Sequence, residues 1–156
     1  MTVRARPDPH PSDPQGSTSM RPVKGRAKVF SGVREAHRSE IVEDYVELIA
    51  ELIGQNGEAR PVDIARRMGV KQPTVAKNLA RLKREGLIVH ERYRSIFLTE
   101  AGRRLAETCR HRHQVVVDLL VRLGLDRETA ELDAEGLEHH VSDRTMAVFK
   151  KFLATD

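Results

Sequence analysis

The segment from residue 60 to residue 98 constrains the fold of this chain more than any other. It contains two helical patterns, over about 61–68 and 72–85, that are separated by a glycine. Pro61 and Pro73 stand in the first turns of these patterns, where a helix needs no amide hydrogen. The second pattern has apolar residues at helical spacing, at Val75, Leu79 and Leu82. Two short helices around a glycine turn predict a helix-turn-helix.

Two β-prone runs, 87–89 and 95–98, follow the second helix directly and enclose a basic tip. A β-hairpin in this place is the wing of a winged helix. Residues 60–94 hold ten basic and three acidic side chains, whereas residues 32–59 hold two basic and seven acidic ones. A basic segment beside an acidic one predicts a module that binds a polyanion such as DNA. A merely well-solvated basic surface is the alternative.

Polar side chains of the motif predict how it would contact double-stranded DNA. The N-terminal turns of a recognition helix face base edges in the major groove, whereas wing residues and downstream basic groups meet phosphates. Base contacts are therefore expected from Gln72, Thr74, Lys77 and Asn78. Phosphate contacts are expected from Arg81, Arg92 and Arg94.

The rest of the chain predicts a mainly α protein. An amphipathic helix is expected over about 32–53, so that residues 32–98 form a winged helix-turn-helix DNA-binding domain. Helices are also expected within 99–156, after the cap residues Thr99, Asp126 and Ser142. This helical domain is too small to be independent, which predicts a homodimer. Residues 1–31 are rich in proline and lack apolar periodicity, which predicts a disordered basic arm.

Composition predicts a soluble, cytoplasmic protein without a membrane partner. No run approaches the roughly 20 apolar residues that a membrane-spanning helix needs. The amino-terminal residues show no apolar signal core. A single cysteine, Cys109, excludes an internal disulfide and a cysteine-rich zinc module. We expect it to be a packed thiol in a reducing compartment.

The octet DAEGLEHH at residues 133–140 gathers carboxylates and imidazoles in a short stretch. On a helix, Glu135, Glu138 and His139 stand at i, i+3 and i+4 and project from one side. Taken by itself, the octet could simply be a solvated surface. A metal site would need matching ligands from other elements of the chain. Three candidates supply them: Asp44, Glu47 and His113. Four carboxylates would balance two divalent cations, which favours a two-metal cluster.

Four motifs stand in order over about residues 35–152: DYVELI, QPTVAK, RHQ and DAEGLEHH. Together they resemble the diphtheria-toxin-repressor family of metal-dependent regulators, and within it the manganese-transport-regulator branch. The resemblance implies that two Mn²⁺ ions per subunit are bound by Asp44, Glu47, His113, Glu135, Glu138 and His139. In the iron-responsive branch, Met replaces Asp44 and Cys replaces Glu135. The oxygen donors of this chain suit Mn²⁺ instead.

The resemblance implies a homodimeric, Mn²⁺-activated regulator, not an enzyme, that represses manganese-uptake genes by binding a palindromic operator. One alternative is an iron-responsive or a metal-independent winged-helix regulator. Another is a di-metal carboxylate enzyme, but such enzymes carry Glu-x-x-His pairs on two helices of a bundle. No Glu in this sequence is followed by His at i+3.

Overall fold

Helices dominate the chain, as its sequence predicts. The structure, a computed structural model, describes residues 26–90 and 95–155. Its elements in chain order are α1 (Arg26–Asn56), α2 (Pro61–Met68), α3 (Gln72–Arg84), β1 (Ile88–Val89), β2 (Phe97–Leu98), α4 (Glu100–Arg122), α5 (Arg127–Leu137), the 3₁₀ turn η1 (Glu138–His140) and α6 (Asp143–Leu153). β1 and β2 pair antiparallel, so a mainly α fold with a winged helix-turn-helix is confirmed. Over the described ranges, no helix combines the length and the apolar character that crossing a bilayer requires.

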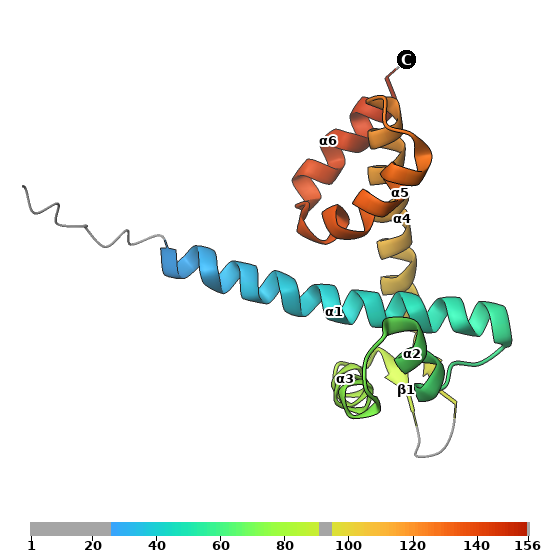
Figure 1. Cartoon of the computed structure of the whole chain (residues 1–156). Coiled ribbons are helices and arrows are strands. Elements are labelled where there is room, and N and C mark those ends of the chain that lie inside the picture. Colours follow the sequence, from blue (N-terminus) through green and yellow to red (C-terminus); the bar gives the residue numbers. More distant parts are fainter. Residues whose placement is uncertain (1–25, 91–94, 156) are drawn as a thin grey trace, which may run out of the picture.

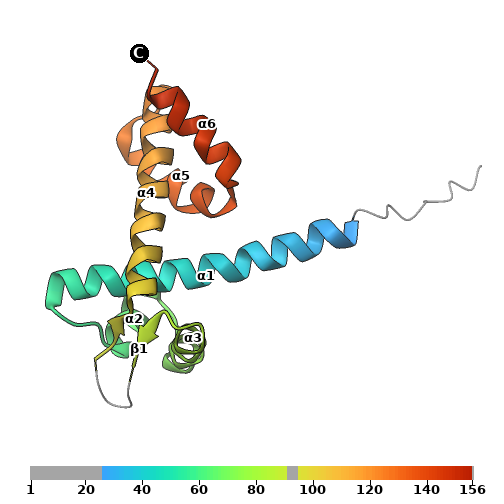
Figure 2. The same cartoon turned by 180° about the vertical axis from the view of Figure 1, so that it is seen from behind.

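The long helix α1 is the element that both halves of the molecule share (Figure 1). The helices α2 and α3 and the β-hairpin lie on one side of α1, and α4 rises from its other side. The helices α5 and α6 pack against the far part of α4, and the view from behind shows the same arrangement (Figure 2). The two halves therefore meet where α1 contacts α4 and η1.

The half of the molecule that contains α2, α3 and the hairpin, which is the predicted DNA-binding half, has an apolar core built on α1. Its fully buried side chains include Val46, Ile49, Ile64, Val75, Leu82 and Ile96. Gly69 ends α2 in the left-handed conformation, with φ of 64°, and so makes the turn into α3. An additional β-bridge between Ala59 and Ile96 ties the hairpin to the segment before α2. The predicted inward stripe of α3 is buried, which fixes the orientation of its polar face.

The other half, called the helical half, consists of the far part of α4 with α5, η1 and α6. It has a second core around α4. The buried side chains are Val115, Val116 and Val117 of α4, Ala130 and Ala134 of α5, and Met146 of α6. The predicted cap residues are confirmed, because the side chains of Thr99, Asp126 and Ser142 each accept a hydrogen bond from a backbone amide three residues later. Cys109 is buried on α4, as expected of a packed thiol.

The first helix is longer than the sequence predicts. It begins at Arg26 rather than near Gly32, so residues 26–31 are helical and do not belong to the predicted disordered arm. No proline lies between Arg26 and Gly32, and the backbone can therefore continue the helix without a break. Residues 1–25 of the predicted arm lie outside the described residues.

The octet is not carried by one continuous α-helix, as its spacing had suggested. The helix α5 ends at Leu137, and Glu138, His139 and His140 form the 3₁₀ turn η1. Arg112 of α4 donates hydrogen bonds to the carbonyl oxygens of Glu138 and Val141. Those carbonyls are thus satisfied outside an α-helix, and the chain can turn more tightly there.

Gly102 marks a close approach between the hairpin and α4. A Cβ atom on Gly102 would overlap with the Leu87 carbonyl oxygen and lie 3.2 Å from Cδ2 of Leu98. We expect Gly102→Ala to lower the free energy of unfolding by about 2 kcal/mol or more, because the backbone would have to shift. Gly54→Ala is the matched control, since its Cβ would meet nothing within 4 Å. This substitution should raise the free energy of unfolding by about 0.5–1 kcal/mol. Equal urea midpoints for the two variants would contradict this packing.

Candidate metal centre and DNA-binding face

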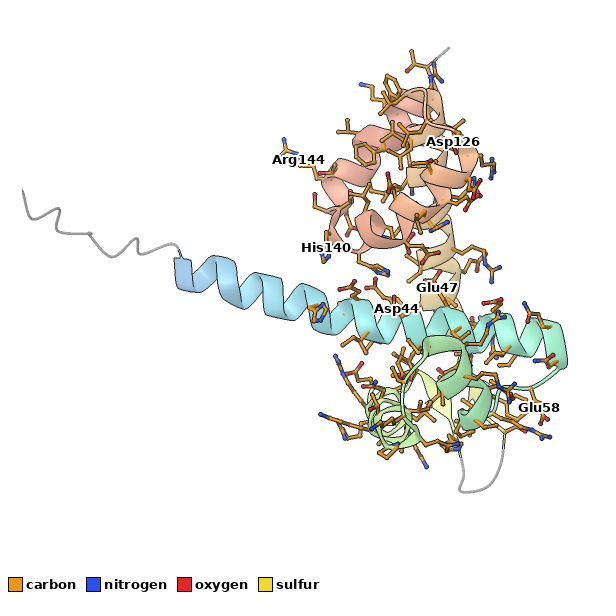
Figure 3. All side chains as sticks on the ribbon, viewed as in Figure 1. Asp44, Glu47, Glu58, Asp126, His140 and Arg144 are labelled. Atoms are coloured by element: carbon orange, nitrogen blue, oxygen red, sulfur yellow. The ribbon has the colours of Figure 1, made fainter. Side chains whose placement is uncertain are left out.

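The predicted metal ligands come together between the two halves of the molecule. A pocket of about 500 Å³ lies between α1, α4 and α5. Asp44 and Glu47 project from α1 toward the helical half (Figure 3). Five of the six predicted ligands line this pocket: Asp44, Glu47, His113, Glu135 and Glu138. The sixth, His139, contacts Asp44 from η1.

His139 connects η1 to the acidic face of α1. Its Nδ1 lies 2.8 Å from the Glu43 carboxylate, and its Nε2 lies 3.2 Å from Oδ1 of Asp44. The Nε2 atom also lies 3.6 Å from Oε1 of Glu138. The hydrogen bonds to Asp44 and Glu43 raise the pKa of His139 to about 10. The imidazole is therefore protonated at neutral pH in the absence of metal.

His113 is the second imidazole of the cluster and comes from the middle of α4. Its Nδ1 lies 2.7 Å from Oε2 of Glu138 and 3.9 Å from Oε1 of Glu135. Its Nε2 lies 3.0 Å from Oε2 of Glu131. Burial lowers the pKa of His113, but the hydrogen bond to Glu131 and the charge of Glu138 outweigh burial and leave this pKa raised.

Two carboxylates of the cluster are hard to ionise without a cation. Burial and the nearby charge of Glu138 raise the pKa of Glu47 to about 7. Burial also raises the pKa of Glu138, whose side chain is 3% exposed. Asp44 and Glu135 are more open to solvent. A divalent cation in this pocket would stabilise the charged form of all four carboxylates.

The chemistry of this donor set fits Mn²⁺, although its side chains are paired with one another. Within 26–90 and 95–155, no three His, Cys, Asp or Glu side chains stand ready to hold a metal ion. The imidazoles are hydrogen-bonded to carboxylates, so a metal ion would have to replace protons. Burial raises the pKa of the Cys109 thiol to about 12, which leaves oxygen and nitrogen as the donors. Oxygen and imidazole ligands are suited to hard divalent cations such as Mn²⁺.

Sequence reasoning missed three residues of the cluster, namely Glu43, Arg112 and Glu131. Glu131 stands one helical turn before Glu135 on α5, so a search for helical spacing would have found it. Glu43 is the neighbour of Asp44, but a residue next in sequence usually points elsewhere on a helix. Nothing in the sequence indicates that Arg112 holds η1 through main-chain carbonyls.

The polar face of α3 is open to solvent. Gln72, Thr74 and Lys77 are exposed, and Asn78 and Arg81 are partly exposed. The Arg81 guanidinium lies 2.7 Å from the Glu85 carboxylate. Arg92 and Arg94, predicted to bind phosphates from the wing, lie outside the described residues. The exposed start of α3 is thus available to enter a DNA groove.

Comparisons with known proteins support both halves of this description. The family model described as "Iron dependent repressor, N-terminal DNA binding domain" matches residues 37–96. The model described as "Iron dependent repressor, metal binding and dimerisation domain" matches residues 99–155. The pocket therefore lies where a DNA-binding domain meets a metal-binding and dimerisation domain.

Two relatives of this chain are bacterial transcriptional regulators. The chain is 52% identical over 130 residues to the transcriptional regulator MntR of Escherichia coli O6:H1, which covers 83% of this chain and 84% of that protein. It is 36% identical over 101 residues to the HTH-type transcriptional regulator MntR of Bacillus subtilis strain 168, over 65% of this chain and 71% of that protein.

Among solved structures, a manganese-dependent transcriptional repressor in complex with manganese matches with a TM-score of 0.64 and 31% identity. The match covers 74% of this chain and 53% of that one. The structure of the manganese regulator SloR matches with a TM-score of 0.62 and 30% identity, and this chain again spans about half of its length (54%). Taken with the two family models, these matches show that the chain belongs to the iron-dependent repressors, which are the diphtheria-toxin-repressor family.

Proposed function

We propose that this chain is a manganese-responsive transcriptional regulator that represses manganese-uptake genes by binding a palindromic operator as a homodimer. The observation that carries the proposal is the cluster of oxygen and nitrogen donors at the junction between the DNA-binding half and the helical half. Two similar solved structures, of a manganese regulator and of a manganese-dependent repressor, support manganese as the signal. Such a regulator acts on operator DNA in the cytoplasm.

The metal ligands of the proposal are the six residues predicted from the sequence. Asp44 and Glu47 come from α1, His113 from α4, Glu135 from α5, and Glu138 and His139 from η1. We infer two Mn²⁺ ions per subunit, because the charges of the four carboxylates in this set would balance those of two divalent cations. Bound ions supply positive charge that holds carboxylates from both halves together. Binding would thereby select the relative orientations of the halves that fit two operator half-sites.

The start of α3 would read the operator. Gln72, Thr74, Lys77 and Asn78 are proposed to meet base edges, and Arg81, Arg92 and Arg94 to meet phosphates. Contacts to phosphates position the protein, whereas contacts to base edges specify the sequence. The buried stripe of α3 supports this assignment, because it turns the polar side chains away from the core.

Exposed apolar side chains of the helical half support dimerisation. They lie on its three α-helices or, for Leu123, directly after α4: Val121, Leu123, Leu132, Leu137, Val148 and Phe152. Leu132 on α5 is 75% exposed, which is unfavourable for a side chain of its size in a monomer. A second copy of the chain would cover part of this surface.

The alternative functions fit the observations less well. A di-metal carboxylate enzyme would leave the helix-turn-helix without a role, and the family favours a regulator over an enzyme. A metal-independent regulator would leave the buried charges of Glu138 and His139 unexplained. An iron-responsive regulator would be expected to place sulfur donors where this chain has Asp44 and Glu135.

Operator binding as a function of free Mn²⁺ tests the proposed function. A duplex selected from a random library with Mn²⁺ present provides the operator. We expect Mn²⁺ to raise operator affinity about 100-fold, which corresponds to about 2.7 kcal/mol of coupling, and Fe²⁺ to raise it less. His139→Ala should remove the response, while the control His140→Ala, next to it and exposed, should keep it. If the operator affinity is the same with and without metal ions, the chain is a metal-independent regulator.

The affinity for Mn²⁺ should rise steeply with pH. A protonated imidazole has no lone pair for a metal, and a neutral carboxyl is a weak ligand. The pKa of Glu47 is about 7, so this carboxyl is largely ionised above neutral pH, whereas the pKa of His139 is about 10, so its imidazole must lose a proton when an ion binds. We expect about a tenfold gain in affinity per pH unit for each proton displaced between pH 7 and pH 9. Titration of the metal-free chain with Mn²⁺ at several pH values measures this, and a flat profile would argue against these ligands.

A charge on the exposed apolar surface should separate the subunits. We expect Leu132→Glu to shift the chain from dimer to monomer in analytical ultracentrifugation, because two carboxylates would have to be buried in the interface. Operator affinity should fall with it, since one subunit contacts one half-site. Val62→Glu is the matched control on exposed α2 and should leave the sedimentation unchanged. A Leu132→Glu dimer as stable as the unmodified one would place the interface elsewhere.

A further inference from the structure

Two carboxylates outside the proposed ligand set each contact one of its imidazoles. Glu43 of α1 lies 2.8 Å from Nδ1 of His139, and Glu131 of α5 lies 3.0 Å from Nε2 of His113. In both rings the opposite nitrogen faces proposed metal ligands. Nε2 of His139 faces Asp44, and Nδ1 of His113 lies 2.7 Å from Glu138. Each imidazole is therefore held between an outer carboxylate and the pocket.

We propose that Glu43 and Glu131 are positioning residues of the metal centre, which fix the ring orientation and tautomer of the two imidazole ligands. The inference rests on the proposed function, because it concerns how this chain binds Mn²⁺. Glu43 accepts the Nδ1 hydrogen of His139 and leaves its Nε2 for the metal. Glu131 accepts the Nε2 hydrogen of His113 and leaves its Nδ1. The two rings thus use different nitrogens as ligands.

A neutral imidazole carries one hydrogen, and the group that accepts it decides which nitrogen keeps a free lone pair. A carboxylate acceptor also increases the basicity of that lone pair and stops the ring from rotating. Without Glu43, His139 could present either nitrogen to Asp44. An ion that binds between α1 and η1 needs a fixed donor, since both elements must hold it at once.

The two outer carboxylates are themselves held by a further group. Oε1 of Glu43 accepts a hydrogen bond of 2.8 Å from the Ser39 hydroxyl, while its Oε2 contacts His139. Oε1 of Glu131 pairs with the Arg127 guanidinium at 3.2 Å, while its Oε2 contacts His113. In each case one oxygen is anchored on the same helix, and the other is directed at the imidazole.

The position of these carboxylates separates them from the proposed ligands. The pocket between the halves is lined by Glu135, Glu138 and His113 but not by Glu43 or Glu131. Glu43 lies on the Nδ1 side of His139, whereas Asp44 lies on the Nε2 side. Glu43 is also the less exposed of the two, at 21% against 45% for Glu131. Its removal should therefore have the larger effect.

The test compares alanine and glutamine variants of both residues in the full chain. Binding of Mn²⁺ is followed by the electron paramagnetic resonance signal of the free ion. We expect Glu43→Ala and Glu131→Ala to weaken binding by about 10- to 100-fold at unchanged stoichiometry. Glu43→Gln and Glu131→Gln should lose less, because an amide oxygen still accepts the imidazole hydrogen. The controls are Glu40→Ala, which removes a carboxylate paired with His37 on α1, and Glu128→Ala on α5.

A second measurement reads the imidazoles directly. In the Cd²⁺-loaded chain, which is diamagnetic, nitrogen-15 spectra should show His139 bound through Nε2 and His113 through Nδ1. In Glu43→Ala the His139 signal should become a mixture of the two forms, while Glu40→Ala should leave it unchanged. A merely structural carboxylate would not alter which nitrogen binds the metal.

The outcomes distinguish this inference from the proposed function. If the unmodified chain binds Mn²⁺ while both alanine variants bind it equally well with unchanged spectra, only the positioning role is overturned. If a glutamine variant binds Mn²⁺ as weakly as the alanine variant and binds one ion fewer than the unmodified chain, Glu43 or Glu131 is a direct ligand. The inference is then also wrong. If the unmodified chain does not bind Mn²⁺ at all, the proposed function fails, and the positioning role fails with it.

Discussion

The contact of His139 with the acidic face of α1 is the interaction on which the arrangement of the two halves depends. The side chain is 3% exposed and meets Glu43 and Asp44 from α1. The halves are also joined by α4, because Ala106 belongs to the first core and Val116 to the second. A single helix between two cores leaves their relative rotation open to adjustment. The turn η1 supplies the second connection, and its polar groups can respond to a cation.

The helix α1 transmits a change at this contact because its two faces have different neighbours. Tyr45 and Ile49 are packed in the core of the DNA-binding half, where close packing allows little local movement. Asp44 and Glu47 lie on the face toward η1 and α4. A metal ion that pulled on these carboxylates would therefore move α1 together with α2 and α3. In the proposed function, the position of α3 would thus depend on this cluster.

Most of the fold could be predicted from local sequence patterns. Prolines in first turns, the left-handed Gly69 and the stripe of Val75, Leu79 and Leu82 located the helix-turn-helix, because each feature depends only on neighbouring residues. The start of α1 and the end of α5 could not be predicted in this way. The end of α5 depends on Arg112, which reaches the carbonyls of Glu138 and Val141 from another helix.

The candidate site could be predicted as a set of residues but not as a network. Spacing and resemblance together singled out six residues, of which five line one pocket and the sixth, His139, contacts Asp44 at its edge. They did not reveal that Glu138 is almost fully buried or that Glu43 reaches His139 across the junction. Burial and contacts between elements arise from tertiary packing, and one sequence contains no direct signal for them. The ligand roles of these residues remain predictions until metal binding is measured.

Protons and metal ions compete for the same atoms at this junction, so a metal ion that binds there must displace protons. The raised pKa values of Glu47 and His139 mean that protons neutralise part of the cluster in the metal-free chain. The protonated His139 ring pairs with Glu43 and Asp44 of α1, but it carries only one hydrogen on each nitrogen. A divalent cation can bind several carboxylates at once. Mn²⁺ is the weakest binder among comparable divalent ions, so a site for it needs many negative oxygens. The four carboxylates gathered between the two halves would provide that charge, and metal binding would thereby be linked to the position of α3.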